Sequence, residues 1–210
     1  LEAGIRDIVF KDGLFEIAGT DRSVSWDSIV NAAFSPDLLP NGLETGLSVN
    51  AQFESSAPNY PSGCHACEVE IDMETGKVEI VRYVGVSDVG NVINPLLLNG
   101  QIYGGIGQGA GQVLMEGIRY DQQTGQMQTG SFLDYAMPRA SDFCSFELTD
   151  NPTITEVNPM GSKGVGEVGT ACAMPTVVNA VVDALAPLGV KHVDMPVSAE
   201  NIWTAINMAG

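Results

Sequence analysis

The strictest alternation of apolar and polar residues lies between residues 66 and 86. Residues 67–71 read Cys-Glu-Val-Glu-Ile, and residues 78–84 have a similar pattern, Val-Glu-Ile-Val-Arg-Tyr-Val. A period of two puts the apolar side chains on one face of a strand. Between them, residues 73–76 end in a glycine, which suits the left-handed position of a turn. The pattern predicts a β-hairpin with one solvent-facing side.

Four further segments have the features of helices. Ser25 can cap a short helix over residues 26–34, and Asn94-Pro95 offers a cap followed by a proline in the first turn of a helix over residues 96–117. A later segment with apolar residues at helical spacing predicts a buried helix, and Ser198 is the expected cap of a terminal helix that ends at Met208. The apolar faces are formed by Val177, Val178, Val181, Val182 and Leu185 in the buried helix and by Ile202, Trp203 and Ile206 in the terminal one.

Shorter patterns complete the expected fold. Residues 8–10 and 14–17 flank Asp12-Gly13 and predict a small hairpin, while residues 145–148 predict another strand. Strands and helices mix irregularly, which predicts an α+β fold in which a mixed or antiparallel sheet packs against helices. We treat residues 1–210 as one region, with possible subdomains at 1–60 and 61–210.

The charge balance narrows the range of partners. The chain has 26 acidic and 9 basic residues and a formal net charge of −17, so it should repel the phosphates of nucleic acids and anionic membrane surfaces. We find no stretch of roughly 20 uncharged apolar residues that could span a membrane. The chain starts at Leu1 with neither a methionine nor a signal segment, so we expect it to begin within a longer protein. Its four cysteines are too sparse for a disulfide scaffold, which favours the cytoplasm, with the periplasm as the alternative.

The first candidate site is a run of glycines inside the helix expected over residues 96–117. Five glycines lie at positions 104, 105, 107, 109 and 111. Each interior glycine costs about 1 kcal/mol relative to alanine, so either a neighbouring element packs tightly against this backbone or a ligand approaches it. Gln101 and Gln108 fall on one helix face, where their carboxamides could bind a polar ligand, although exposed glutamines are the commoner explanation.

The second candidate is the loop of residues 161–169, Gly-Ser-Lys-Gly-Val-Gly-Glu-Val-Gly. It contains a G-x-G-x-x-G pattern, but residues 157–160 are a poor end for the buried strand that a dinucleotide site requires. Glu167 would also repel phosphate oxygens. The loop is better suited to hold a carboxylate just before a helix, where a desolvated glutamate can act as a general base. An exposed loop acid without a function is the alternative.

The third candidate is Cys64-His65-Ala-Cys67, which could indicate zinc or redox chemistry. No second cysteine pair has zinc-ribbon spacing, and Cys67 begins a predicted strand, where residues three apart face opposite sides. Packing of small thiols is therefore favoured, and we assign no metal ligand. With His65 and His192 as the two histidines, a hydrolase with an activated serine or cysteine is not expected.

Five segments, in order, resemble the large subunit of the molybdenum hydroxylases, the family of xanthine dehydrogenase, aldehyde oxidoreductases and aerobic carbon monoxide dehydrogenase. Residues 166–170, Gly-Glu-Val-Gly-Thr, look most like carbon-monoxide-dehydrogenase-like large subunits and depart from the Gly-Glu-Pro-Pro form typical of xanthine dehydrogenases. This departure leaves the substrate open. The five segments are residues 69–78, 86–95, 100–109, 134–138 and 161–167.

The resemblance implies roles for particular residues. In the family, the glutamate of the Gly-Glu motif lies beside the metal, so Glu167 would be the general base of a reaction that oxidises an aldehyde, an N-heterocycle or carbon monoxide with oxygen from water. Gln101 matches a position whose side chain contacts the molybdenum-pterin cofactor, molybdopterin or its cytosine dinucleotide, and Gln108 lies close to the same site. We expect a hollow between Glu167 and the Gln101 helix. The glycines that would allow the cofactor to approach are Gly104, Gly105 and Gly166.

The resemblance also implies components outside this chain. The segments that hold the pterin lie largely upstream in the family, so we expect the isolated chain to lack the cofactor and to be inactive. Its partners would be the remainder of the large subunit, an iron-sulfur (FeS) subunit, an FAD subunit and a small-molecule substrate. Two alternatives stay open: a non-catalytic assembly or interaction module that retains the fold, and an oxidoreductase that binds a dinucleotide at residues 164–169.

Overall fold

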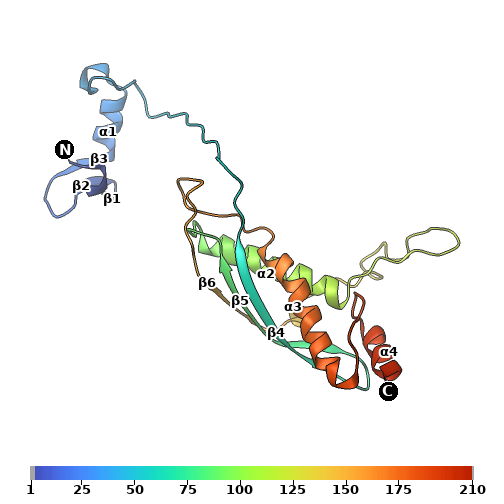
Figure 1. Ribbon diagram of the computed structural model, residues 1–210. Coiled ribbons are helices and arrows are strands. Elements are labelled where there is room, and N and C mark those ends of the chain that lie inside the picture. Colours follow the sequence, from blue (N-terminus) through green and yellow to red (C-terminus); the bar gives the residue numbers. More distant parts are fainter. Residues whose placement is uncertain (1–2, 210) are drawn as a thin grey trace. The chain divides into compact units, whose positions relative to one another are not determined.

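The computed structural model describes residues 3–209 and divides into two compact units, one ending at Glu54 and one beginning at Ser55 (Figure 1). In the first unit, an antiparallel three-stranded sheet is followed by a short helix. Asp12 and Gly13, with φ of 50° and 80°, form the predicted turn, and the Ser25 side chain accepts a hydrogen bond from the Ser28 amide as the predicted cap. The elements are β1 (Ile8–Lys11), β2 (Leu14–Ile17), β3 (Ser23–Ser25) and α1 (Trp26–Ala33), with short 3-10 turns at Ile5–Asp7 and Pro36–Leu38.

The second unit is built on a mixed three-stranded sheet with β5 at its centre. β4 (Ser62–Ile71) pairs antiparallel with β5 (Val78–Asp88), and β6 (Phe146–Asp150) pairs parallel with β5. Gly76 has a φ of 72° in the turn between β4 and β5, so the predicted hairpin is confirmed. The mixed sheet packed against helices confirms the predicted α+β class.

Three helices accompany this sheet, and α2 and α3 lie over the same face (Figure 1). α2 (Pro95–Leu114) is capped by Asn94, whose side chain accepts the Leu97 amide, and it ends before the expected residue 117. α3 (Val168–Leu185) follows the glycine loop and continues into a 3-10 turn at Ala186–Leu188. α4 (Ala199–Ala209) is capped by Ser198, and a last 3-10 turn lies at Ala140–Asp142.

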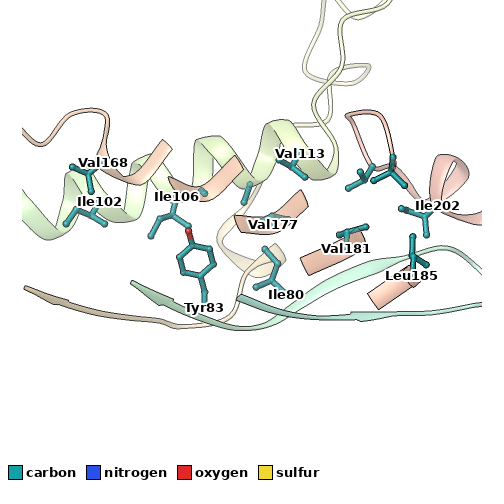
Figure 2. Close-up of a cluster of buried hydrophobic side chains, with 14 of the residues drawn as sticks. Ile80, Tyr83, Ile102, Ile106, Val113, Val168, Val177, Val181, Leu185 and Ile202 are labelled. Carbon is teal, nitrogen blue, oxygen red and sulfur yellow. The ribbon is translucent and has the colours of Figure 1, made fainter. Parts of the chain in front are cut away.

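The main core lies between the sheet and these helices (Figure 2). Tyr83 of β5, Ile106 of α2 and Val177 of α3 are fully buried there, as the helical spacing predicts for Val177. The predicted apolar faces of α3 and α4 include residues that are not fully buried. Val178 and Val182 are only partly buried, and Trp203 is 47% exposed because the buried face of α4 is centred on Ile202.

One structural finding differs from the expectation about membranes. The segment Val168–Leu188 is long and apolar enough, by length and composition, to cross a membrane. In this structure Ala173, Val177, Val181 and Leu185 on one side of α3 are at most 1% exposed, because they pack in the core. Core packing is therefore a sufficient reason for the apolar composition of this helix.

Candidate active site

A close backbone contact joins the start of α3 to the middle of α2. A Cβ atom added to Gly169 would lie 2.5 Å from the carbonyl oxygen of Ile102 and 2.8 Å from the amide nitrogen of Ile106. One added to Gly105 would lie 2.9 Å from the amide nitrogen of Thr170, whose hydroxyl donates a 3.1 Å hydrogen bond to the Gly105 carbonyl. Glycine allows this approach because it has no Cβ atom. Figure 2 shows the result, with Val168 of α3 beside Ile102 of α2.

Other glycines of the two candidate motifs face open space. Gly104 in α2 and Gly166 in the loop are exposed, and a Cβ atom at either would meet nothing within 4 Å. Gly104 lies one turn from both Gln101 and Gln108, and all three are exposed on the same side of α2. We call these three residues the open face of α2. The two explanations left open by the sequence therefore apply to different glycines, with close packing at Gly105 and open space at Gly104.

Glu167 lies at the N-terminus of α3, next to the residues that contact α2. Its side chain is exposed and makes no capping hydrogen bond to the first turn, although its carbonyl accepts the Ala171 amide at 2.9 Å. The carboxylate thus stays available for other partners. The burial expected for a desolvated base is not supplied by the described residues of this chain.

A cavity of about 250 Å³ lies where the N-terminal part of α2 meets the glycine loop. Gln101 lines it from the helix, and Ser162, Lys163 and Val165 line it from the loop. A hollow is therefore present between α2 and the loop, but Glu167, which we expected beside it, does not line it and lies two residues beyond the wall at Val165. The remaining lining is mostly apolar and consists of Val89, Asn91, Val92, Ile93, Asn94, Leu97 and Leu98.

The loop is tied to the end of the central strand by a group of short hydrogen bonds. The Lys163 amide donates to the Val89 carbonyl at 2.7 Å, and the Asn91 amide donates to the Gly161 carbonyl at 2.9 Å. The ammonium group of Lys163 lies 2.8 Å from the carboxylate of Asp88, and these side chains are only 12% and 17% exposed. Lys163, together with the amides of Thr153 and Gly90, holds the pKa of Asp88 well below its ordinary value.

The sequence assigned no role to Asp88 or Lys163. An acid that ends an apolar strand and a base inside a glycine loop were visible in it, but nothing local indicated that they pair. Their contact joins residues that are far apart along the chain, so it depends on how the loop folds back onto β5.

The structure argues against the dinucleotide alternative. Residues 157–160 form no strand before the loop, whereas a dinucleotide fold places the glycine motif directly after one. Gly169, the last glycine of the pattern, packs against the backbone of α2. The spacing of these glycines therefore serves a helix contact.

The cysteine pair lies within one strand, and one detail of its prediction was wrong. β4 begins at Ser62, so Cys67 does not open it. Cys64 is exposed, whereas Cys67 is partly buried and its thiol lies 3.5 Å from the Thr176 carbonyl. Burial raises the pKa of the Cys67 thiol to about 11, which makes it a poor ligand and nucleophile at neutral pH. Among residues 3–209, no group of three or more His, Cys, Asp or Glu side chains could hold a metal ion.

Comparisons with known proteins agree with the motifs. Residues 1–144 match the molybdopterin cofactor-binding domain family. The large subunit of nicotine 6-hydroxylase from Paenarthrobacter nicotinovorans is 37% identical over 207 residues, which are 98% of this chain and 25% of that protein. The large chain of carbon monoxide dehydrogenase from Hydrogenophaga pseudoflava is 32% identical over 208 residues, again 98% and 25% of the two lengths.

Solved structures show the same relationship. Quinoline 2-oxidoreductase from Pseudomonas putida 86 superposes with a TM-score of 0.85 at 36% identity, covering 98% of this chain and 26% of that one. The chain thus spans about a quarter of the length of the relatives it matches. The resemblance drawn from the five segments is confirmed: the chain belongs to the molybdopterin cofactor-binding domain family, in the group of the molybdenum hydroxylase large subunits.

Proposed function

We propose that this chain is the C-terminal part of the molybdenum-pterin-binding domain of a hydroxylase, with Glu167 as its general base. The observation that carries the proposal is the glycine contact between α2 and α3. Because Gly169 packs on the turn that contains Ile102 and Gly105, Glu167 is held close to the part of α2 that presents Gln101. The two motifs that the resemblance singles out thereby belong to one site.

The open face of α2 fits a flat, polar cofactor. Gln101 and Gln108 offer carboxamide donors and acceptors on either side of Gly104, where no atom blocks the backbone within 4 Å. Gly166 is equally open beside Glu167, and Gly105 allows the first turn of α3 to pack on α2 next to this face. We assign these residues to the binding of the molybdenum-pterin group. When bound, that group activates water and accepts the electrons of substrate oxidation.

Two features suit Glu167 to the role of a general base. Its carboxylate is not used as a helix cap, and its backbone adjoins the turn of α3 that packs on α2. We infer that it accepts the proton that water loses as its oxygen passes to the substrate. The remainder of the large subunit would cover the carboxylate and exclude bulk water.

The substrate and the partner subunits follow from the same assignment. Nicotine and quinoline, named in two relatives, are N-heterocycles, and a third relative is named for carbon monoxide. We infer a small substrate of one of these kinds or an aldehyde, and electron transfer through FeS and FAD partners. The isolated chain would be inactive, because it presents only one wall of the cofactor site.

The test is Glu167→Gln in the complete enzyme. This change keeps the size of the side chain and removes its basicity, so we expect turnover to fall by at least ~100-fold while molybdenum content stays near normal. Glu74→Gln is the matched control, since Glu74 is exposed in the β4–β5 turn, and it should leave turnover unchanged. Turnover close to wild type in Glu167→Gln would exclude the base and favour a non-catalytic assembly module.

A further inference from the structure

Glu167 lies between two points at which the chain is held in place. On its C-terminal side, Gly169 packs against the backbone of α2. On its N-terminal side, the last side chain tied to the sheet is Lys163, through its ion pair with Asp88 at 2.8 Å. Between Lys163 and Glu167, Gly164 and Gly166 have no atom within 4 Å of an added Cβ, so the partly buried Val165 is the one residue of this stretch that packs against the core.

Asp88 joins three segments at the end of the central strand. One carboxylate oxygen meets Lys163, and the other accepts the amides of Gly90 at 3.0 Å and Thr153 at 2.9 Å. The carboxylate therefore connects the end of β5, the segment after β6 and the glycine loop. Gly90 lets the loop come this close, because a Cβ atom there would collide with the Gly161 carbonyl.

The ion pair contrasts with another on the same sheet. Arg82 of β5 and Glu147 of β6 also pair, at 2.9 Å, but their side chains are 60% and 59% exposed. Exposed pairs of this kind contribute little to stability. The Asp88–Lys163 pair is largely shielded from solvent. Its Lys163 lines the same cavity as Gln101.

We propose that Asp88 and Lys163 are positioning residues for Glu167: their ion pair fixes the glycine loop, and with it the carboxylate, relative to the open face of α2. This inference rests on the proposed function. A misplacement of about 1 Å at a reacting group can cost on the order of 100-fold in rate. Because Gly164 and Gly166 make no close contact, few other contacts hold this part of the loop, and the ion pair supplies one of them.

The decisive variant is the double change Asp88→Asn with Lys163→Met in the complete enzyme. Either single change leaves one shielded charge without its partner and should lower the melting temperature. The double variant removes both charges, so its melting temperature should return toward wild type, and the carboxamide oxygen introduced by Asp88→Asn can still accept the Gly90 and Thr153 amides. We expect kcat to remain at least tenfold low, with KM and molybdenum content little changed. The double variant Arg82→Met with Glu147→Gln is the control and should keep wild-type kcat.

A combination with Glu167→Gln separates positioning from general stabilisation. If the pair acts through Glu167, adding both changes to Glu167→Gln should lower kcat little further, because residues that act as a unit are not additive. Recovery of kcat together with stability in the double variant would overturn the inference, as would loss of molybdenum or full additivity with Glu167→Gln. If Glu167→Gln alone has wild-type kcat, the proposed function itself fails.

Discussion

Two sets of glycines in the same part of the molecule have opposite surroundings. Gly105, Gly109 and Gly169 lie where α2 and α3 touch, and an added Cβ at each would come within 3.0 Å of a neighbouring atom. Gly104 and Gly166 have nothing within 4 Å. The glycine run in α2 is thus two overlapping features, one that allows helix packing and one that leaves a surface open.

The energetic consequences of these two sets differ. An interior helical glycine costs about 1 kcal/mol relative to alanine. At Gly105 and Gly109, close packing of α3 offsets that cost, because the helices could not approach with larger residues. At Gly104 no described residue offers compensation, which agrees with our proposal that this surface serves the cofactor.

The largest effect is expected for Gly169→Ala. The atoms nearest to the new methyl group are the Ile102 carbonyl and the Ile106 amide, and backbone atoms cannot rotate away. We expect the free energy of unfolding of the chain to fall by about 3 kcal/mol, measured by urea denaturation. Gly164→Ala in the open loop is the control and should change it by less than about 0.5 kcal/mol. A loss below about 1 kcal/mol for Gly169→Ala would show that the helices are not in tight contact.

A somewhat smaller effect is expected for Gly109→Ala. Its new methyl group would lie 2.9 Å from the Cβ of Ala173 and 3.0 Å from the Thr170 carbonyl, so we expect a loss of about 2 kcal/mol. Ala173→Gly removes the first of these clashes. In a double-mutant cycle, the two changes together should therefore destabilise less than the sum of the single changes. Simple additivity would place Ala173 away from Gly109.

The local features of this fold were predictable from the sequence, and the long-range ones were not. The caps Ser25, Asn94 and Ser198 and the turn at Gly76 follow from short-range rules, and the structure confirms them. The parallel pairing of β6 with β5 could not be read, because it depends on a crossover through α2. The sequence also could not predict that Gly105 is packed while the adjacent Gly104 is open, because this difference depends on where α3 docks on α2.

The candidate site shows the same limit. Glu167 could be selected because an acid among glycines ahead of a helix is unusual, and its assignment as the base stays a prediction. The sequence left open whether Glu167 is buried or exposed, since burial depends on what covers the loop. The Asp88–Lys163 pair was missed because the partners belong to separate segments, and no local pattern shows that the two segments meet.

A loss of about 1 kcal/mol is expected for Thr170→Val. The Thr170 hydroxyl donates a partly buried hydrogen bond to the Gly105 carbonyl at 3.1 Å, and valine keeps the shape while removing the donor. Thermal unfolding of the chain would measure the change. Thr155→Val is a suitable control, because the Thr155 hydroxyl receives only a long 3.4 Å bond from the Val157 amide. An equal loss of stability in both variants would mean that the hydrogen bond across the helix contact contributes no more than the long local bond of Thr155.

The smallest change in stability, and the sharpest test of the comparison, is expected for Gly104→Ala. Because the site is helical and open, alanine should stabilise the chain by roughly 0.5 to 1 kcal/mol. In the complete enzyme the same methyl group would stand between Gln101 and Gln108, where we place the cofactor, so molybdenum content per large subunit should fall. Gly100→Ala, equally open but one turn nearer the N-terminus and so not between Gln101 and Gln108, should give the same stabilisation with normal molybdenum content. If Gly104→Ala alone raises stability and lowers molybdenum content, this glycine is retained for a ligand. If Gly104→Ala and Gly100→Ala have the same molybdenum content, Gly104 is not part of the cofactor site.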